Sequence, residues 1–156
     1  MVQTPIFRLL YVSTASASAA MTLHETMRAI LQVSEANNRR DDITGFLLSD
    51  GYVFVQVLEG PEANVQECFS RICTDGRNRA PDVRDAGPAA ERLFPQWSMC
   101  GLNLSGRDNL LLRPGHIGFN LLDAVPGALL QHLQTLVQHH GAALMQAHAP
   151  LLGPSF

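Results

Sequence analysis

The stretch Ile43–Gly60, ITGFLLSDGYVFVQVLEG, decides the fold of this chain. It consists of two apolar runs that are joined by Ser49-Asp50-Gly51. An Asp-Gly pair between β-rich runs predicts a tight hairpin, because glycine adopts the positive φ that such turns need. In the second run, successive side chains point to opposite faces. One face carries Tyr52, Phe54, Gln56 and Leu58, and the other carries Val53, Val55 and Val57.

Gln56 is the residue of this hairpin that does not fit a plain core. Both faces of its run are apolar, which predicts a central strand that is covered on both sides. A carboxamide has two donors and two acceptors, and burying them unpaired costs on the order of 1–3 kcal/mol. The sequence therefore predicts a polar partner for Gln56 inside the protein.

The segment before the hairpin predicts one strand and one helix. Residues 6–12, IFRLLYV, are typical of a strand, and the small residues 13–20 are typical of a loop. Thr22 and Glu25 form a capping-box pattern, and the apolar spacing that follows predicts a helix over about 22–36.

The segment after the hairpin predicts a second helix and two more strands. Pro61 is placed to be the first residue of this helix, which ends by Gly76. Its apolar positions are Val65, Cys68, Phe69, Ile72 and Cys73. A short strand near Val83 and a fifth strand within 93–104 follow. This order predicts an α+β fold, a ferredoxin-like βαββαββ sheet with both helices on one face.

The other face of the predicted sheet is also apolar and needs a cover. It carries Leu10, Val12, Val53, Val55 and Val57. After Pro126, a helical pattern presents an apolar stripe over 129–137. This stripe can pack on the bare face or against a second subunit, and the sequence leaves both alternatives open.

The composition limits the class of protein. The chain has 156 residues, of which 46% are hydrophobic and 16% charged, so it can bury a sizeable core. A formal net charge of -3 gives no electrostatic reason to expect nucleic acid or an anionic membrane as partner. Three cysteines without a CxxC pair suit a reducing compartment. Since neither a leader pattern nor a run of 18 apolar residues is present, we expect a cytoplasmic protein.

Several polar residues are predicted to lie near Gln56. Tyr11 is on the helix-facing side of the first strand, which neighbours the Gln56 strand in a split βαβ sheet. Asn37 and Asn38 follow the first helix, and Arg71 lies late in the second. Each of them alone has a structural explanation, such as a core tyrosine or a helix cap. Together they offer the donors and acceptors that a flat heterocycle with carbonyl and ring-nitrogen edges requires.

Four segments carry a resemblance to a known family. They are LLYVS (9–13), NN…DITGFLL (37–48), FVQVLEGP (54–61) and RLFPQWSM (92–99). Over roughly residues 5–104, the chain resembles the BLUF family of flavin-binding blue-light sensors. The resemblance implies a ferredoxin-like sheet with FAD held non-covalently between the two helices.

The resemblance also implies roles for individual residues. Tyr11 would hydrogen-bond Gln56, which bonds the flavin ring, and Asn38 would meet the carbonyl and ring-nitrogen edge with Asn37 beside it. The further cofactor-binding residues that it implies are Arg71, Ile72, Asp75 and Arg77. Trp97 and Met99 match the pair on the fifth strand that changes with light.

Three features depart from the family pattern. The loop 13–21 is longer than usual, which leaves the contacts between the first strand and the first helix open. Arg77-Asn78 stands where many members have Arg-His, which leaves open which residues contact the adenine or phosphate end of the cofactor. The segment 82–91 is a poor strand, which predicts that the fourth strand is short.

The resemblance implies a sensor rather than an enzyme. Light would drive electron and proton transfer from Tyr11 to the flavin, and the rearranged hydrogen bonds would act on the fifth strand through Met99 and Trp97. The sensor domain would cover 1–104, and a C-terminal helical extension would cover 105–156. We expect an unidentified signalling protein as the downstream partner, and a homo-oligomer, with no nucleic acid and no membrane.

Three alternatives are weaker. A hydrolase of the acylphosphatase type needs an arginine in the loop after the first strand, and STASASAA (13–20) has no basic residue. An interaction module without flavin has no need of the tyrosine, glutamine and asparagine set. A metal site on His132, His139 and His140 lacks a carboxylate or cysteine that is placed to complete it.

Overall fold

The computed structural model describes residues 5–49, 52–96, 99–103 and 121–138. Its strands are β1 (Ile6–Ala15), β2 (Thr44–Ser49), β3 (Val53–Gly60), β4 (Asn78–Ala89) and β5 (Cys100–Asn103). Its helices are α1 (Ala17–Met21), α2 (Leu23–Arg40) and α3 (Glu62–Cys73), and a further helical stretch covers 126–138. The order confirms the predicted α+β class. The predicted turn at Asp50-Gly51 lies outside the described residues.

The sheet has the predicted split βαβ arrangement. Its strand order is β4-β1-β3-β2-β5, in which the first four strands are antiparallel and β5 joins β2 in parallel. β1 and β3 are therefore central neighbours, and their register sets Tyr11 directly opposite Gln56. Leu47 of β2 lies opposite Gln56 on the other neighbouring strand. Residues opposite one another in antiparallel strands share a face, so these three side chains form one row.

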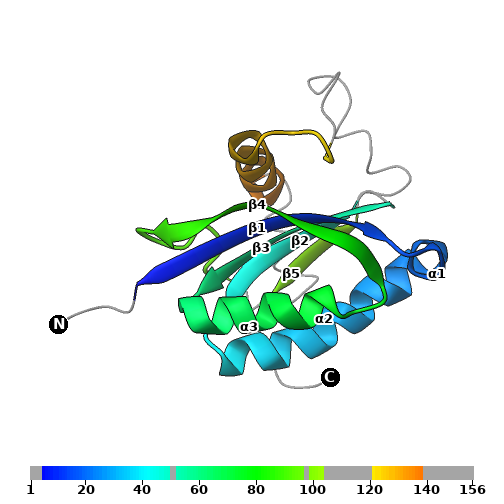
Figure 1. Ribbon diagram of the computed structural model, residues 1–156, viewed down its shortest axis with the longest axis horizontal. Helices are drawn as coiled ribbons and strands as arrows, with labels where there is room; N and C mark the ends of the chain where they lie inside the picture. The colour runs from blue at the N-terminus through cyan, green and yellow to red at the C-terminus, as the bar shows by residue number, and fades with distance from the viewer. Residues whose placement is uncertain (1–4, 50–51, 97–98, 104–120, 139–156) are drawn as a thin grey trace.

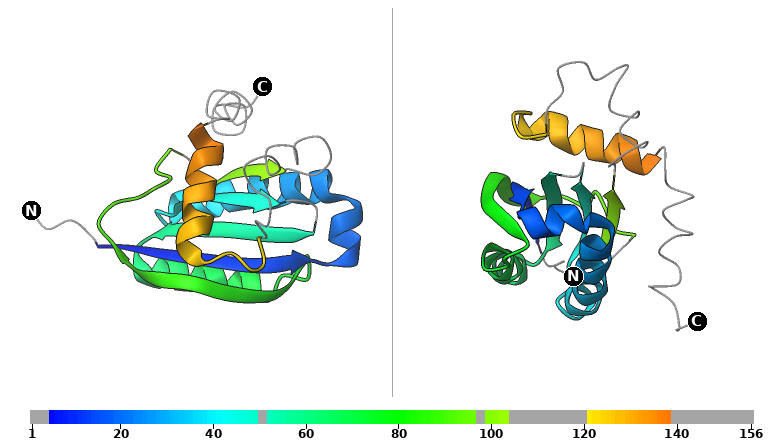
Figure 2. Two further views of the ribbon diagram at one scale, coloured as in Figure 1. Left: turned by 90° about the horizontal axis from the view of Figure 1, so that it is seen from above. Right: turned by 90° about the vertical axis from the view of Figure 1, so that its right-hand side faces the viewer.

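Both faces of the sheet are covered by helices. α2 and α3 pack on one face, and helix 126–138 crosses the other (Figure 1, Figure 2). The core on the side of α2 and α3 contains Leu9, Tyr11, Met27, Leu31, Phe54, Leu58 and Val65. The core on the opposite side contains Leu10, Val12, Val55, Val57, Leu129, Leu133 and Leu136. The C-terminal stripe thus covers the sheet within the chain, and the predicted alternation of faces in β3 is confirmed.

The loop predicted over 13–20 is wrong in part. β1 continues to Ala15, which pairs with Asn78 of β4, and α1 follows. Ser16 caps α1, because its side-chain oxygen accepts a hydrogen bond from the N–H of Ala19. The alanines of this segment favour a helix once a cap is present.

The predicted limits of the first long helix are also wrong. Thr22 makes no capping hydrogen bond, and its hydroxyl donates instead to the carbonyl of Ser18 in α1. α2 continues to Arg40, so Asn37 and Asn38 lie in its last turn rather than after it. This extra turn matters, because it fixes the two asparagines on a rigid element.

Three smaller boundaries differ from the sequence prediction. β4 has twelve residues rather than a short core, and β5 covers 100–103. Pro61 is the N-cap of α3 rather than its first residue. Cys73 is exposed because it is the last residue of α3, whereas Cys68 is buried as its spacing predicted.

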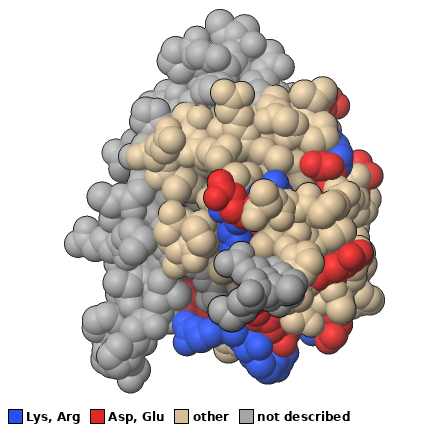
Figure 3. All heavy atoms as spheres, turned by 90° about the vertical axis from the view of Figure 1, so that its left-hand side faces the viewer, with Lys and Arg blue, Asp and Glu red and all other residues tan. Residues whose placement is uncertain are grey.

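Two further features of the described residues are the distribution of surface charge and the length of the helices. On the face shown in Figure 3, acidic and basic side chains lie next to one another, so that face has no extended patch of one sign. Among the described residues, no helix is long and apolar enough to cross a membrane.

Gly45→Ala is expected to lower the free energy of unfolding by at least about 1–3 kcal/mol, as overpacked cores do. A Cβ on Gly45 would lie 2.0 Å from the carbonyl oxygen of Val57 and 3.1 Å from Cε of Met99, so β2 and β3 would have to move apart. Urea denaturation measures the change. Gly87→Ala in β4 is the control, because nothing lies within 4 Å of its Cβ position. Equal unfolding midpoints for the two variants would contradict this close approach.

Candidate functional site

Tyr11 and Gln56 form a buried hydrogen bond at the centre of the sheet. The phenol Oη of Tyr11 donates to Oε1 of Gln56 at 2.5 Å, and each residue is only 4% exposed. Nε2 of Gln56 donates to the sulfur of Met99 at 3.3 Å. The polar partner that the sequence requires for Gln56 is therefore Tyr11, with Met99 on the other side of the amide.

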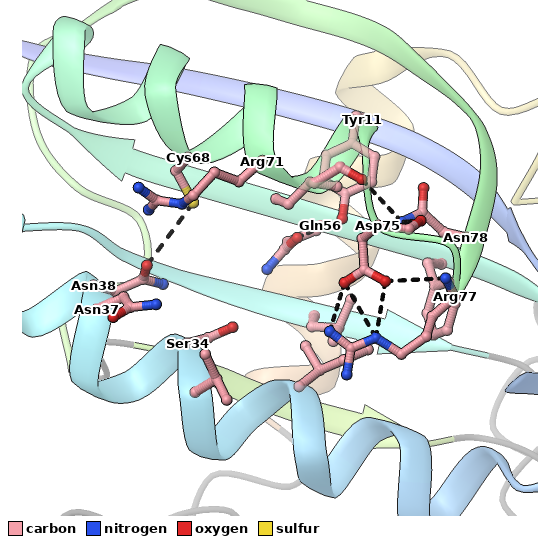
Figure 4. Close-up of a pocket in the computed structure, with 15 residues that line it drawn as sticks. Tyr11, Ser34, Asn37, Asn38, Gln56, Cys68, Arg71, Asp75, Arg77 and Asn78 are labelled. Atoms are coloured by element: carbon pink, nitrogen blue, oxygen red, sulfur yellow. Dashed lines mark hydrogen bonds and ion pairs between the residues drawn. The ribbon is translucent and has the colours of Figure 1, made fainter.

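A cavity of about 190 Å³ opens beside this pair, between the sheet and the helices α2 and α3 (Figure 4). All eight residues that the family resemblance implied for cofactor binding contribute to its lining. They are Tyr11, Asn37, Asn38, Gln56, Arg71, Ile72, Asp75 and Arg77. Met99 contacts the lining through Gln56, and Trp97 lies outside the described residues.

Other residues of the lining were not predicted as site residues. They are Ile30, Val33, Ser34, Leu47, Phe54, Cys68 and Asn78. Most are apolar and have the spacing of core positions, so periodicity alone cannot separate them from the core. They give the cavity apolar walls, which suit a flat ring.

Asn38 forms the polar end of the cavity near α2. It is 2% exposed, and its backbone carbonyl accepts a hydrogen bond from the N–H of Ile43. The Cys68 thiol donates to Oδ1 of Asn38 at 3.9 Å. Burial raises the pKa of the Cys68 thiol, so the sulfur stays protonated and acts as a donor. Asn38 is thus held by contacts from two directions.

Two arginines lie at the rim of the cavity and are paired with acids. Arg71 donates to Glu67 at 2.9 Å and lies 3.6 Å from Asp41. Arg77 binds both carboxylate oxygens of Asp75, with Nη2 at 2.5 Å from Oδ2 (Figure 4). The hydrogen bonds from Arg77 hold the pKa of Asp75 below its usual value. The rim therefore carries positive charge that is compensated in the structure described.

Tyr11 is a neutral hydrogen-bond donor in this setting. Burial raises the pKa of its phenol far above the usual value, and the negative charge of Asp75 acts in the same direction. Its ring packs against Phe69, with ring centroids 5.3 Å apart. The phenol O–H thus points to Oε1 of Gln56, and Phe69 of α3 packs against the ring.

Residues 6–100 match the family model of BLUF, described as sensors of blue-light using FAD. The chain belongs to the BLUF family. The resemblance carried by the four sequence segments is thereby confirmed.

Two curated relatives are much longer than this chain. The chain is 29% identical over 112 residues to the photoactivated adenylate cyclase subunit alpha of Euglena gracilis. This match covers 72% of this chain and 11% of that protein. It is 33% identical over 84 residues to the blue light- and temperature-regulated antirepressor BluF of Escherichia coli, covering 53% of this chain and 21% of that protein. The chain thus spans from about a tenth to a fifth of the length of these curated relatives.

A solved BLUF structure covers nearly the same length as this chain. The dark-state structure of BlrB, a BLUF protein, superposes with a TM-score of 0.66 and 30% identity. The match covers 87% of this chain and 97% of BlrB. The BLUF domain therefore occurs both as a small protein and as one part of larger light-regulated proteins.

The residues of this BLUF cavity suit a flavin. Asn37, Asn38 and Gln56 supply the amide donors and acceptors that complement ring carbonyls and ring nitrogens. Leu47 and Ile72 contribute apolar surface to the cavity wall, which would suit the faces of a flat ring. Across the described residues, no group of three or more His, Cys, Asp or Glu side chains is placed to hold a metal ion, and His139 and His140 lie outside them.

Asp75→Asn is expected to lower the free energy of unfolding at pH 7 by at most about 1 kcal/mol, since the pair with Arg77 is partly exposed. The native pKa of Asp75 is lowered, so the pair stabilises the fold above the unfolded-state pKa of about 3.9 and ceases to do so as pH falls below it. Urea unfolding at pH 7 and pH 3.5 should therefore show a difference that shrinks with acid. Asp82→Asn, in the more exposed pair with Arg84, is the matched control. If the difference in free energy of unfolding between wild type and Asp75→Asn grew at low pH, the Asp75–Arg77 pair would not be the stabilising interaction.

Proposed function

We propose that this chain is a blue-light photoreceptor that binds FAD non-covalently in the cavity between α2 and α3. The observation that carries the proposal is the Tyr11–Gln56 hydrogen bond, because it lies in the wall of that cavity and is buried from water. A phenol and an amide of this kind couple a redox-active side chain directly to a ligand that the amide can bond.

The lining supports a particular orientation of the cofactor. Gln56 and Asn38 would bond the carbonyl and ring-nitrogen edge of the flavin, with Asn37 beside them. Arg71 and Arg77 at the rim would meet the ribityl and phosphate groups, in competition with their acidic partners Glu67 and Asp75. Asp75 would then set how readily Arg77 becomes available.

The photochemical step follows from the donor properties of Tyr11. A bound flavin supplies a strong one-electron oxidant when it absorbs blue light. Tyr11 would give an electron to the excited flavin, and its phenol, made strongly acidic, would pass its proton along the 2.5 Å bond to Gln56. With that bond disrupted, the Gln56 amide would rotate. The electron and the proton would then return to Tyr11, so the net redox change would be zero while the amide stays rotated. The altered hydrogen bond to the ring carbonyl shifts the absorption to the red.

The output would begin at Met99. Rotation of the Gln56 amide removes the N–H that Met99 accepts, and Met99 directly precedes β5. Strand β5 leads toward the C-terminal segment, which we propose as the extension 105–156 after a sensor domain 1–104. The chain would have no catalytic activity of its own and would signal to a cytoplasmic protein partner or through a homo-oligomer, with Trp97 taking part.

An absorption experiment tests this function. The purified protein should be yellow, and blue light should move its flavin band reversibly to the red. Chromatography of the cofactor released by heat distinguishes FAD from FMN and riboflavin. A colourless protein that takes up none of these flavins would instead support an interaction module.

A further inference from the structure

Glu59 is a fully buried carboxylate that the flavin site does not use. It follows Gln56 by three residues on β3 and points to the opposite face of the sheet, with 0% exposure. Its oxygens accept hydrogen bonds from Nε of Arg8 at 2.8 Å, from the N–H of Leu93 at 3.0 and 2.9 Å, and from the N–H of Phe94 at 2.8 Å. A buried charge with this set of donors is fully engaged, so its position is tightly defined.

The segment that Glu59 holds has further contacts to the sheet. Arg92 donates to Oγ1 of Thr44 at 2.9 Å and to the carbonyls of Glu59 and Asp42 at 3.0 and 2.9 Å. The Phe94 ring is 1% exposed and stacks on Phe46, with centroids 5.6 Å apart. Residues 92–94 are therefore fixed to both β2 and β3.

Strand β3 thus holds the segment 92–99 at two points, by hydrogen bonds of different strength. At one end, the Glu59 carboxylate binds the backbone of 93–94 through charge-assisted hydrogen bonds. At the other end, the Gln56 amide bonds the thioether of Met99, which is a weak acceptor. The five-residue step from Phe94 to Met99 spans these two points. One attachment is fixed, and the other is the bond that rotation of Gln56 removes.

We propose that Glu59 is a positioning residue of the light response: it anchors residues 92–94, so that a displacement at Met99 moves β5 instead of being absorbed by the preceding segment. The inference rests on the proposed function, because it assigns the route by which the structural change would travel from the flavin site to β5. Phe94 and Phe46 also belong to the core beneath helix 126–138, so the anchored segment packs in the same core as the covering helix.

Hydrogen exchange of single amides tests the anchor. In the flavin-loaded protein, the amides of Leu93 and Phe94 should exchange slowly and at equal rates in darkness and under blue light, while amides of 100–103 change their rate at least about fivefold under light. Glu59→Gln keeps an acceptor oxygen but loses the charge, so Leu93 and Phe94 should exchange at least about tenfold faster. The red shift should persist in this variant, and the light effect on 100–103 should fall below half of its wild-type size.

The control is Glu91→Gln, whose side chain is exposed and which lies next to the same segment. It should behave as the wild type in every measurement. If Glu59→Gln does not fold, Arg8→Gln removes the ion pair from the same carboxylate and should give the same pattern in weaker form.

The outcomes separate this inference from the proposed function. A wild-type protein that binds flavin but shows no red shift would overturn both. A normal red shift with light-accelerated exchange at Leu93 and Phe94 would overturn the anchor alone. So would an undiminished light effect on 100–103 in a folded Glu59 or Arg8 variant.

Discussion

Tyr11→Phe is expected to leave the flavin bound and to abolish the red shift induced by blue light. The variant keeps the ring that packs against Phe69 and removes the hydroxyl that donates to Gln56. Without that hydroxyl, the side chain has neither a proton to transfer nor a bond that sets the orientation of the amide. The light-minus-dark absorption spectrum of the purified variant measures the effect, and we expect complete loss of the difference signal.

The chain contains its own control for this variant. Tyr52 is the second of its two tyrosines and is 76% exposed, so Tyr52→Phe should shift like the wild type. Tyr11→Phe also leaves Oε1 of Gln56 without the phenol donor, which should lower the free energy of unfolding by about 1–3 kcal/mol. A Tyr11→Phe protein with a normal red shift would disprove the proposed photochemical step.

The adjacency of Tyr11 and Gln56 could be predicted because it depends on strong local patterns. The hairpin, the alternation in the third strand and the apolar first strand each limit the topology, and the split βαβ order makes the first and third strands neighbours. An uncharged but polar Gln56 in an otherwise apolar run then marks the site. The structure bears out this chain of inference in the β1–β3 register.

Two predicted elements had wrong boundaries, because the hydrophobic pattern of their sequence does not mark where they begin and end. β4 is an edge strand with mostly exposed side chains, so neither face produces a period of two, and its pairing with β1 carries bulges. α2 extends through Asn37 and Asn38 although these residues favour turns, because Asn38 is buried, contacts Cys68 of α3 and accepts a hydrogen bond from the N–H of Ile43. Tertiary contacts override local propensity in both cases.

Glu59 illustrates a different limit. At the end of an apolar run, a glutamate is typical of the point where a strand meets solvent. Its partners Leu93 and Phe94 are 34 and 35 residues away in the chain, and they bind it through backbone N–H groups that no residue type reveals. Such a contact is accessible from the structure and not from sequence spacing.

Leu133→Ala is expected to lower the free energy of unfolding by about 2–5 kcal/mol. Leu133 is 0% exposed at the centre of helix 126–138, where it packs in the same core as Leu10 and Val57 of the sheet. The substitution removes three carbon atoms from a site that is enclosed by the sheet on one side. Urea denaturation followed by circular dichroism measures the loss, and the red shift should persist because the flavin cavity lies on the other face.

The dependence of unfolding on protein concentration tests whether the stripe 129–137 covers the sheet of its own chain, as the structure has it, or joins two subunits. Gln134→Ala, an exposed position on the same helix, should change the free energy of unfolding by less than about 0.5 kcal/mol. If the helix serves as a cover within one chain, the unfolding midpoint of wild type and variant will not depend on protein concentration. If the stripe instead joins two subunits, the wild-type midpoint will rise with concentration. The buried leucines would then belong to an interface, and the light signal proposed at β5 would have a direct route to assembly.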